Sequence, residues 1–219
     1  MTDEKMYEHI CTMIREHDES SDKNNANRVI EHPDRWVSDW HPFYASAAEL
    51  LIEIRSRMDA EVTPRARQSA LRRILKNCPS SRPSMAGIFS YGDCFVICDG
   101  YRLIRLRNDI SSLPHVKNDF DVGTIMQDID ASAEPLQLPR IGELRAYIAA
   151  HKVRRGRKMV CEAYCLGDYV WCDPKYLLDM LQALPGCTAY MPKSPISPIY
   201  FTEPNGDDGL LLPVRHYDG

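Results

Sequence analysis

The sequence predicts an α+β fold, and a repeated order of elements is the main reason. Residues 63–107 and 173–215 each begin with a helix that carries a proline in its first turn, followed by three strand candidates. Thr63 and Asp173 precede these prolines, and their side chains are suited to accept the free N–H groups of a first helical turn. We therefore expect two helix-plus-antiparallel-sheet halves, with their helices side by side on one face.

The first half starts with an amphipathic helix that Pro64 begins and Pro79 ends. Its apolar residues recur three or four positions apart, as a buried helical face requires. They are Ala70, Leu71, Ile74, Leu75 and Cys78. Arginine and lysine lie mostly on the opposite face. The strand candidates follow at 85–91, 94–98 and 101–107, and Asp99-Gly100 predicts a tight hairpin between the last two, because glycine supplies the positive φ of such turns.

The second half is introduced by strands 159–166 and 168–172, which we expect to form a hairpin over Gly167 and Asp168. The helix after Asp173 has a leucine stripe and ends at Pro185-Gly186. Strands are expected at 187–191, 198–202 and 209–215.

The N-terminal region differs in composition from these halves. Apolar spacing predicts helices at 1–17 and 45–58, and the polar segment 18–28 predicts a loop between them. We accordingly expect two domains, a helical N-terminal extension over 1–60 and an α+β domain over 61–219. Within the second, 141–152 predicts another helix and 154–158 a basic turn.

Composition limits the classes of function. The chain has 219 residues and a formal net charge of −4, and no apolar stretch approaches a membrane-spanning length. The polar N-terminus shows no secretory signal, so we expect a cytoplasmic protein. Glycine-rich phosphate loops and the HExxH and GxSxG motifs are missing, which argues against an enzyme. A small Cys/His hydrolase remains an alternative.

The spacing of the cysteines raises the question of whether the chain binds a metal ion. Two pairs have three intervening residues, Cys94 with Cys98 and Cys161 with Cys165. Structural zinc pairs usually sit on turns, whereas these residues lie in strand candidates. We expect buried free thiols, with no metal and no other cofactor.

Three segments in this order resemble the bacterial sliding clamp, the beta subunit of the replicative DNA polymerase. DGYRL at 99–103 follows a strand and resembles the clamp's "TDGxRLA"-like motif. The helix at 173–179 resembles the clamp's last helix, and LPVR at 212–215 its C-terminal "MPVR"-type strand. The resemblance covers about 63–107 and 168–216, and it implies one DNA-clamp-like domain.

The resemblance also implies binding to duplex DNA, because clamps encircle DNA with basic helices. The matching residues are Arg65, Arg72, Arg73 and Lys76 on one helix and Lys175 on the other. Such cations attract phosphates without regard to base sequence. The alternative is a solvated helix face with snorkelling arginines.

A partner-binding pocket is a second implication, since clamps hold peptide motifs of replication and repair proteins near these strands. The matching residues are Gly100, Tyr101, Arg102, Leu103, Pro213, Val214 and Arg215. In clamps the two segments belong to neighbouring domains, whereas here they fall in one. A ring would also need several copies of this chain, so a homo-oligomer is possible. Alternatively, both strands simply fill the core.

These observations favour a non-catalytic, DNA-associated clamp-like accessory factor in DNA replication or repair. The alternative is a protein-protein interaction module that keeps the fold and does not bind DNA.

Overall fold

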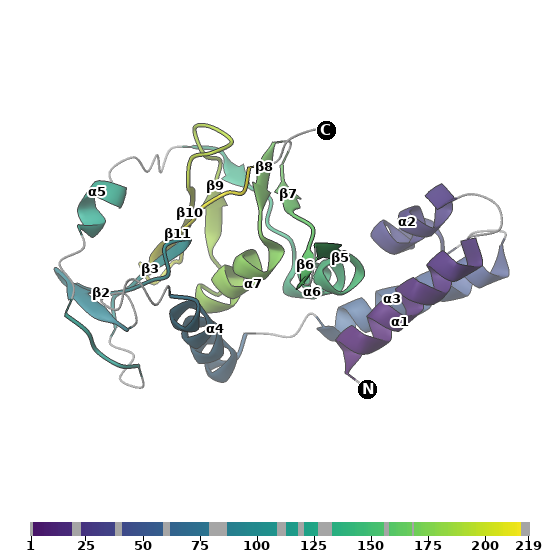
Figure 1. Ribbon diagram of the computed structural model, residues 1–219, viewed down its shortest axis with the longest axis horizontal. Coiled ribbons are helices and arrows are strands. Elements are labelled where there is room, and N and C mark those ends of the chain that lie inside the picture. Colours follow the sequence, from purple (N-terminus) through teal and green to yellow (C-terminus); the bar gives the residue numbers. More distant parts are fainter. Residues whose placement is uncertain are drawn as a thin grey trace. The chain divides into compact units, whose positions relative to one another are not determined.

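The computed structural model describes residues 2–18, 23–37, 41–58, 62–78, 87–108, 113–117, 121–126, 133–155, 158–167 and 169–215 (Figure 1). The chain forms two compact units. The first comprises Met1–Glu61 and Pro139–Glu162, and the second comprises Val62–Leu138 and Ala163–Gly219. Residues 139–162, which we expected in the α+β domain, thus pack with the N-terminal helices. No helix in these ranges is long and apolar enough to cross a membrane.

The first unit is a group of helices with one hairpin. It contains α1 (Asp3–Asp18), α2 (Lys23–Glu31), the 3-10 helix η1 (Pro33–Arg35), α3 (Pro42–Met58), α6 (Ile141–Ala150), β5 (Lys152–Arg155) and β6 (Lys158–Cys161). Helix α1 contacts α3 and α6, and α3 contacts α6. Their shared core includes Tyr7, Ile14, Leu51, Ile54 and Ala146. The helices predicted near 1–17, 45–58 and 141–152 are confirmed.

We expected a loop at 18–28, but residues 23–28 belong to helix α2, whereas residues 19–22 lie outside the described residues. The stretch KNNAN has poor helix propensity, so the sequence alone favours a loop. Three apolar residues, Ala26, Val29 and Ile30, are nevertheless buried in the core of the first unit. Burial of this apolar face outweighs the weak local preference, as is common for helices in proteins.

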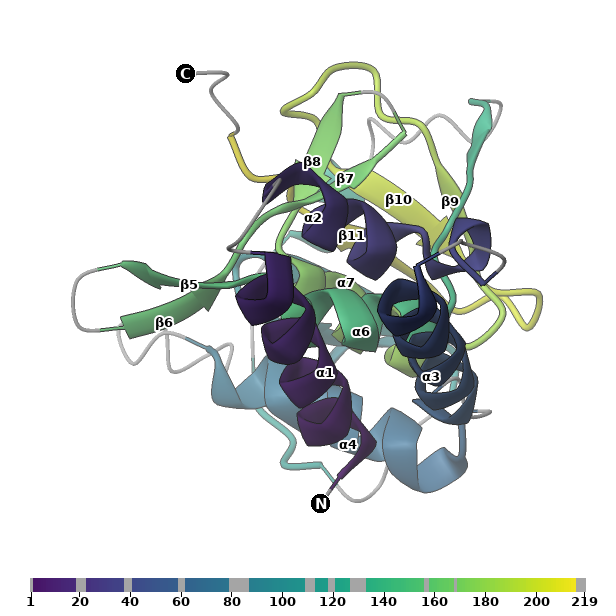
Figure 2. The same cartoon turned by 90° about the vertical axis from the view of Figure 1, so that its right-hand side faces the viewer.

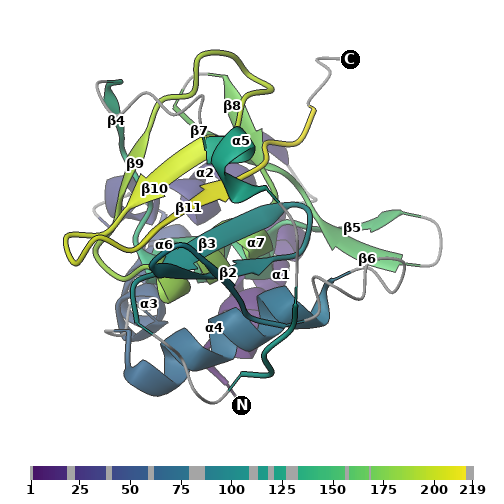
Figure 3. The same ribbon diagram turned by 90° about the vertical axis from the view of Figure 1, so that its left-hand side faces the viewer.

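The second unit is built on a seven-stranded antiparallel sheet in the order β1-β2-β3-β11-β10-β9-β4 (Figure 3). Its strands are β1 (Phe89–Tyr91), β2 (Cys94–Cys98), β3 (Arg102–Leu106), β4 (Pro135–Leu136), β9 (Thr188–Tyr190), β10 (Ile199–Thr202) and β11 (Asp208–Leu211). The short helix α5 (Val122–Met126) and the hairpin of β7 (Tyr164–Leu166) and β8 (Val170–Cys172) complete this unit.

Helices α4 (Pro64–Lys76) and α7 (Pro174–Ala183) pack against each other, and they contact β2 and β11 respectively. Both begin as expected: Thr63 Oγ1 accepts the N–H of Ala66, and Asp173 accepts the N–H groups of Lys175 and Tyr176. Helix α4 precedes β1 to β3, and α7 precedes β9 to β11. The two strand groups join where β3 pairs with β11, so they form one sheet.

Close packing of α7 on the sheet requires a glycine in β11. A Cβ atom on Gly209 would lie 2.6 Å from the carbonyl oxygen of Leu103 and 2.9 Å from Cε of Met180. The carbonyl oxygen of Leu103 is part of the backbone and cannot move without a cost in free energy, so a side chain at residue 209 would push the neighbouring strand or the helix away.

The β2–β3 hairpin is confirmed, but its turn is shifted by one residue. Cys98 pairs with Leu103, and the N–H of Asp99 donates to Arg102 O at 3.1 Å. The turn residues are therefore Gly100 and Tyr101, with Gly100 at φ 87°. A positive φ at the first turn residue is the requirement of a type II′ turn. Asp99 instead folds its carboxylate back onto the N–H groups of Tyr101 and Arg102.

The last strand is shorter than expected, because β11 ends at Leu211 rather than at residue 215. Leu212 still donates its N–H to Tyr101 O at 2.9 Å. Pro213 has no N–H to continue the ladder, and Val214 donates to Trp171 O at 2.8 Å. The segment 212–215 thus leaves β3 and runs toward β8.

Candidate functional site

The exposed face of α4 carries a stripe of three cations, Arg65, Arg72 and Lys76, all of them exposed. Positions seven and eleven residues apart lie within about 40° of arc on a helix and extend over about 16 Å of its length. The opposite face buries Ala70, Leu71 and Ile74. Lys175, at the start of the neighbouring α7, is also exposed. In the described part of the chain these four cations make no ion pair. We call Arg65, Arg72 and Lys76 the α4 stripe.

Arg73, the fourth predicted cation of α4, is held by the protein itself. Its Nε donates to Asp179 Oδ1 at 2.6 Å and its Nη2 donates to Gln182 Oε1 at 2.5 Å, both on α7. The side chain keeps 47% of its exposure. Arg73 therefore links the two helices and has less freedom than the α4 stripe to approach an external anion.

Arg67 was not singled out in the sequence, and it too is held by partners within the protein. Its Nε donates to Ala183 O at 2.9 Å, while Nη2 lies 2.6 Å from Asp207 Oδ2 and 3.2 Å from Glu203 Oε2. Glu203 has a pKa raised by burial, an effect that Arg67 opposes. The helix thus divides its cations between internal partners and the α4 stripe.

The largest fully buried side chain belongs to Arg102, which is 1% exposed. Its Nη2 lies 2.6 Å from Asp99 Oδ2, and its Nη1 lies 2.6 Å from Asp179 Oδ2. The guanidinium also stacks on Tyr176, 4.1 Å from the ring centroid. Because Arg73 binds the other oxygen of Asp179, one carboxylate joins α4, α7 and β3. The sequence placed Arg102 in a partner-binding strand, but its enclosed guanidinium is not available to a partner.

Asp99, Tyr176 and Asp179 of this cluster were missed as well. One usable signal was a charged residue inside the apolar run YLLDMLQAL, since a buried carboxylate needs a cation. Its partner was not readable, because Arg102 lies 77 positions from Asp179.

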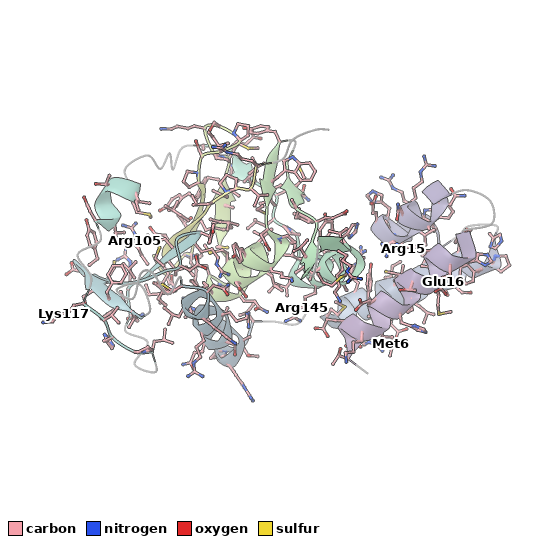
Figure 4. The ribbon with its side chains drawn as sticks, viewed as in Figure 1. Met6, Arg15, Glu16, Arg105, Lys117 and Arg145 are labelled. Atoms are coloured by element: carbon pink, nitrogen blue, oxygen red, sulfur yellow. The ribbon has the colours of Figure 1, made fainter. Side chains whose placement is uncertain are left out.

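Elsewhere on β3, Arg105 is paired with Asp208 of β11 (Arg105 is labelled in Figure 4). Nε donates to Asp208 Oδ1 at 2.7 Å, and Nη2 contacts the second carboxylate oxygen. Hydrogen bonding to Asp208 raises the pKa of Arg105. This pair joins the neighbouring strands β3 and β11, so Arg105, like Arg102, has its charge bound within the protein.

The two predicted partner-binding segments lie next to each other, because the backbone N–H of Leu212 donates a hydrogen bond to the carbonyl oxygen of Tyr101. Tyr101 is 54% exposed and Leu212 is 42% exposed, and the Tyr101 ring lies 5.8 Å from that of Tyr176. Pro213 and Val214 are half-buried and Arg215 is exposed. Leu103, by contrast, is buried in the core with Phe89, Val96, Cys98, Val122 and Leu210. The exposed large apolar side chains of these segments are therefore Tyr101 and Leu212.

Three of the cysteines, Cys11, Cys172 and Cys187, have the opposite character to a nucleophile. Burial raises the pKa of Cys11 and of Cys187 to about 12, and it also raises the pKa of Cys172. A catalytic cysteine needs a lowered pKa, because the thiolate is the reactive form. None of the eight cysteines forms a disulfide, and no group of three or more metal-ligating side chains gathers among the described residues.

Comparison with known proteins leaves the family open. No family model matches the chain, and no curated protein matches its sequence. Among solved structures, the crystal structure of the beta subunit from DNA polymerase of Streptococcus pyogenes matches with a TM-score of 0.40 and 14% identity. The match covers 68% of this chain and 64% of that one. A likeness at this level carries no conclusion about function, whereas the helices and antiparallel sheets of the structure are those of an α+β protein.

Proposed function

We propose that this chain is a non-catalytic, DNA-associated accessory factor with a clamp-like domain, acting in replication or repair. The observation that carries the proposal is the α4 stripe, a row of exposed cations on a helix that has no acidic residue. Lys175 adds a further exposed cation on the adjoining helix.

The physical reason to expect DNA binding is the regular spacing of negative charge along duplex DNA, which presents one phosphate per about 1.7 Å of helix axis. A row of cations about 16 Å long can therefore meet several phosphates at once. Long side chains adjust to their positions, and a helix that reads no base edges binds every sequence alike. Binding of this kind is weak, independent of sequence and steeply reduced by salt.

The test compares two triple variants that lose the same charge. One is R65Q/R72Q/K76Q, and the control is K5Q/R28Q/K193Q, which removes three exposed cations outside the α4 stripe. Affinity for a labelled duplex is measured by fluorescence anisotropy between about 50 and 200 mM salt. The slope of log K against log salt is expected to become shallower by about 2 to 3 in the α4 variant, since each lost phosphate contact removes about 0.9.

Equal slopes for the two variants would show that the α4 stripe does not contact DNA. Absence of binding by the wild type at the lowest salt would reject the proposal as a whole. Circular dichroism melting of all three proteins checks that the loss is not one of folding.

A second candidate is a protein-protein interaction module, and the exposed pair Tyr101 and Leu212 favours it. Both are apolar or aromatic, and neighbouring exposed side chains of this kind mark interaction sites. A second copy of this chain is the partner that can be tested first. Sedimentation analysis should then show an oligomer that Y101D/L212D converts to monomer. A wild type that is monomeric at high concentration would exclude self-association through this surface.

A further inference from the structure

Helices α1 and α3 of the first unit lie side by side, in front of α6 in Figure 2. Arg57, in the last turn of α3, lies 3.3 Å from Asp3 Oδ1 and 3.7 Å from Met6 Sδ, both in the first turn of α1. Near the other end of α1, the His17 ring lies against Phe43 at the start of α3, with centroids 4.1 Å apart. The two helices are therefore antiparallel, and these contacts fix which of their sides face each other.

Three apolar side chains, Ile10, Met13 and Leu50, lie between these two contacts. Ile10 and Met13 follow Met6 by four and seven residues, so they share its side of α1. Leu50 precedes Arg57 by seven residues, so it shares that side of α3. Met13 is 45% exposed and Leu50 is 49% exposed, while Ile10 is half-buried. We call these three residues the α1–α3 seam.

The opposite side of α1 is occupied by the protein itself. Glu8 Oε2 accepts a hydrogen bond from Lys152 Nζ of β5 at 2.7 Å. Arg15 Nη2 donates to Ala150 O, at the end of α6, at 2.9 Å. Glu8 and Arg15 each lie two residues from a seam residue, which is a rotation of about 200° around the helix. The α1–α3 seam is therefore turned away from α6 and β5, in keeping with its exposure.

Carboxylates border the α1–α3 seam on both helices. Glu16 lies three residues after the last seam residue of α1, Glu49 is adjacent to the seam residue of α3, and both are exposed. Neither makes an ion pair with a residue that the structure describes. Arg57, which lies on the same side, is already bound to Asp3 and, at 3.2 Å, to Glu53. An apolar strip with unpaired carboxylates beside it is complementary to an apolar surface that carries cations.

We propose that the α1–α3 seam binds an amphipathic α-helix of another protein, with its apolar residues on the seam and lysine or arginine next to Glu16 and Glu49. A helix that docks in this way presents apolar residues at i, i+3 or i+4, and i+7. The side of α1 from Met6 to His17 extends over about 16 Å, the length of about three turns of such a helix. This surface belongs to the first unit and is independent of the α4 stripe.

The acidic border distinguishes this partner from two other occupants. Helices that lie on membranes carry lysine and arginine around their apolar side, whereas Glu16 and Glu49 are repelled by anionic lipid. A second copy of this chain brings the same two carboxylates to the interface, and Arg57 of each copy is already engaged. A basic helix supplies the charge that the border lacks.

The test uses the full chain and a fluorescein-labelled peptide of about 14 residues, with leucine at helical i, i+3, i+7 and i+10 positions and lysine and alanine elsewhere. A matched peptide carries glutamate in place of lysine. Anisotropy titrations compare the wild type with the seam variant M13Q/L50Q. The control is I125Q/I196Q, which replaces two side chains of the second unit that are also exposed, at 39% and 66%. Glutamine keeps a high helix propensity.

Binding of the lysine peptide is expected to be at least about tenfold weaker in M13Q/L50Q, because a few central apolar side chains carry most of the affinity of an interface. The border variant E16Q/E49Q should bind more weakly than wild type and with less dependence on salt. The control should bind like the wild type. Circular dichroism should show the peptide gaining helix on binding, since so short a helix is marginal in water.

The proposal is overturned if the wild type does not bind the lysine peptide, if M13Q/L50Q binds it equally well, or if the glutamate peptide binds as tightly. It also falls if sedimentation shows a wild-type dimer that M13Q/L50Q converts to monomer, since the occupant is then a second copy. Loss of binding to phosphatidylcholine vesicles in M13Q/L50Q, without loss of peptide binding, has the same consequence. If melting shows M13Q/L50Q to be unfolded, the single variants M13Q and L50Q replace it.

Discussion

The buried cluster around Arg102 makes a sharp prediction about stability. The substitution R102M keeps much of the side-chain volume but removes the cation that Asp99 and Asp179 share. Both carboxylates are buried: Asp99 is 0% exposed and Asp179 is 6% exposed. Water therefore cannot readily replace the lost guanidinium, and the substitution should destabilise the second unit.

The magnitude follows from the geometry. Removing one partner of a buried ion pair costs about 3–5 kcal/mol, because an uncompensated charge stays behind. For a chain of this size each kcal/mol lowers Tm by about 2–4 °C, so a drop of roughly 6–20 °C is expected. The matched control is R73M, which removes a partner of the same Asp179 from a side chain that is 47% exposed. Solvent screens that pair, and its loss should cost no more than about 1 kcal/mol.

Urea and thermal unfolding followed by circular dichroism measure both variants. R102K refines the test, since lysine keeps the charge but lacks the planar fork that reaches two carboxylates and stacks on Tyr176. It should fall between wild type and R102M. If R102M is no less stable than R73M, the cluster does not hold α4, α7 and β3 together, and the reasoning is refuted.

Three further predictions concern packing, capping and thiol reactivity. G209A should lower the free energy of unfolding by about 1–3 kcal/mol, because the new methyl group meets the backbone of Leu103; unchanged urea unfolding would mean that the strand shifts without cost. T63A should cost about 1 kcal/mol through loss of the α4 cap, with T63S as a control that keeps the hydroxyl. Cys11 and Cys187, whose pKa values burial raises to about 12, should be alkylated by iodoacetamide at pH 8 at least about 100-fold more slowly in the native than in the unfolded chain. Mass spectrometry of the labelled peptides measures both rates. Fast labelling of the native chain would contradict the burial of these two thiols.

The sequence determined those features whose causes lie within a few residues. Thr63 and Asp173 cap helices that start where their prolines predict, because the donors they satisfy are two or three positions away. The glycine of the β2–β3 turn is likewise a local requirement. Even there, the exact turn residues depended on the carboxylate of Asp99, which takes up two N–H groups beside it.

Only the tertiary structure decided which elements and charges find partners. Helix α2 forms in a segment of weak propensity, because Val29 and Ile30 are buried against other helices. Of the basic residues on α4, Arg73 joins Asp179 and Arg67 joins Asp207, while Arg65, Arg72 and Lys76 stay exposed. The sequence does not distinguish these five cations, because the position of a residue on a helix shows which side it faces but not which groups lie there in the folded protein. Carboxylates more than 100 positions away settle the difference, because burial of a charge is tolerated only where folding brings its counter-charge into contact.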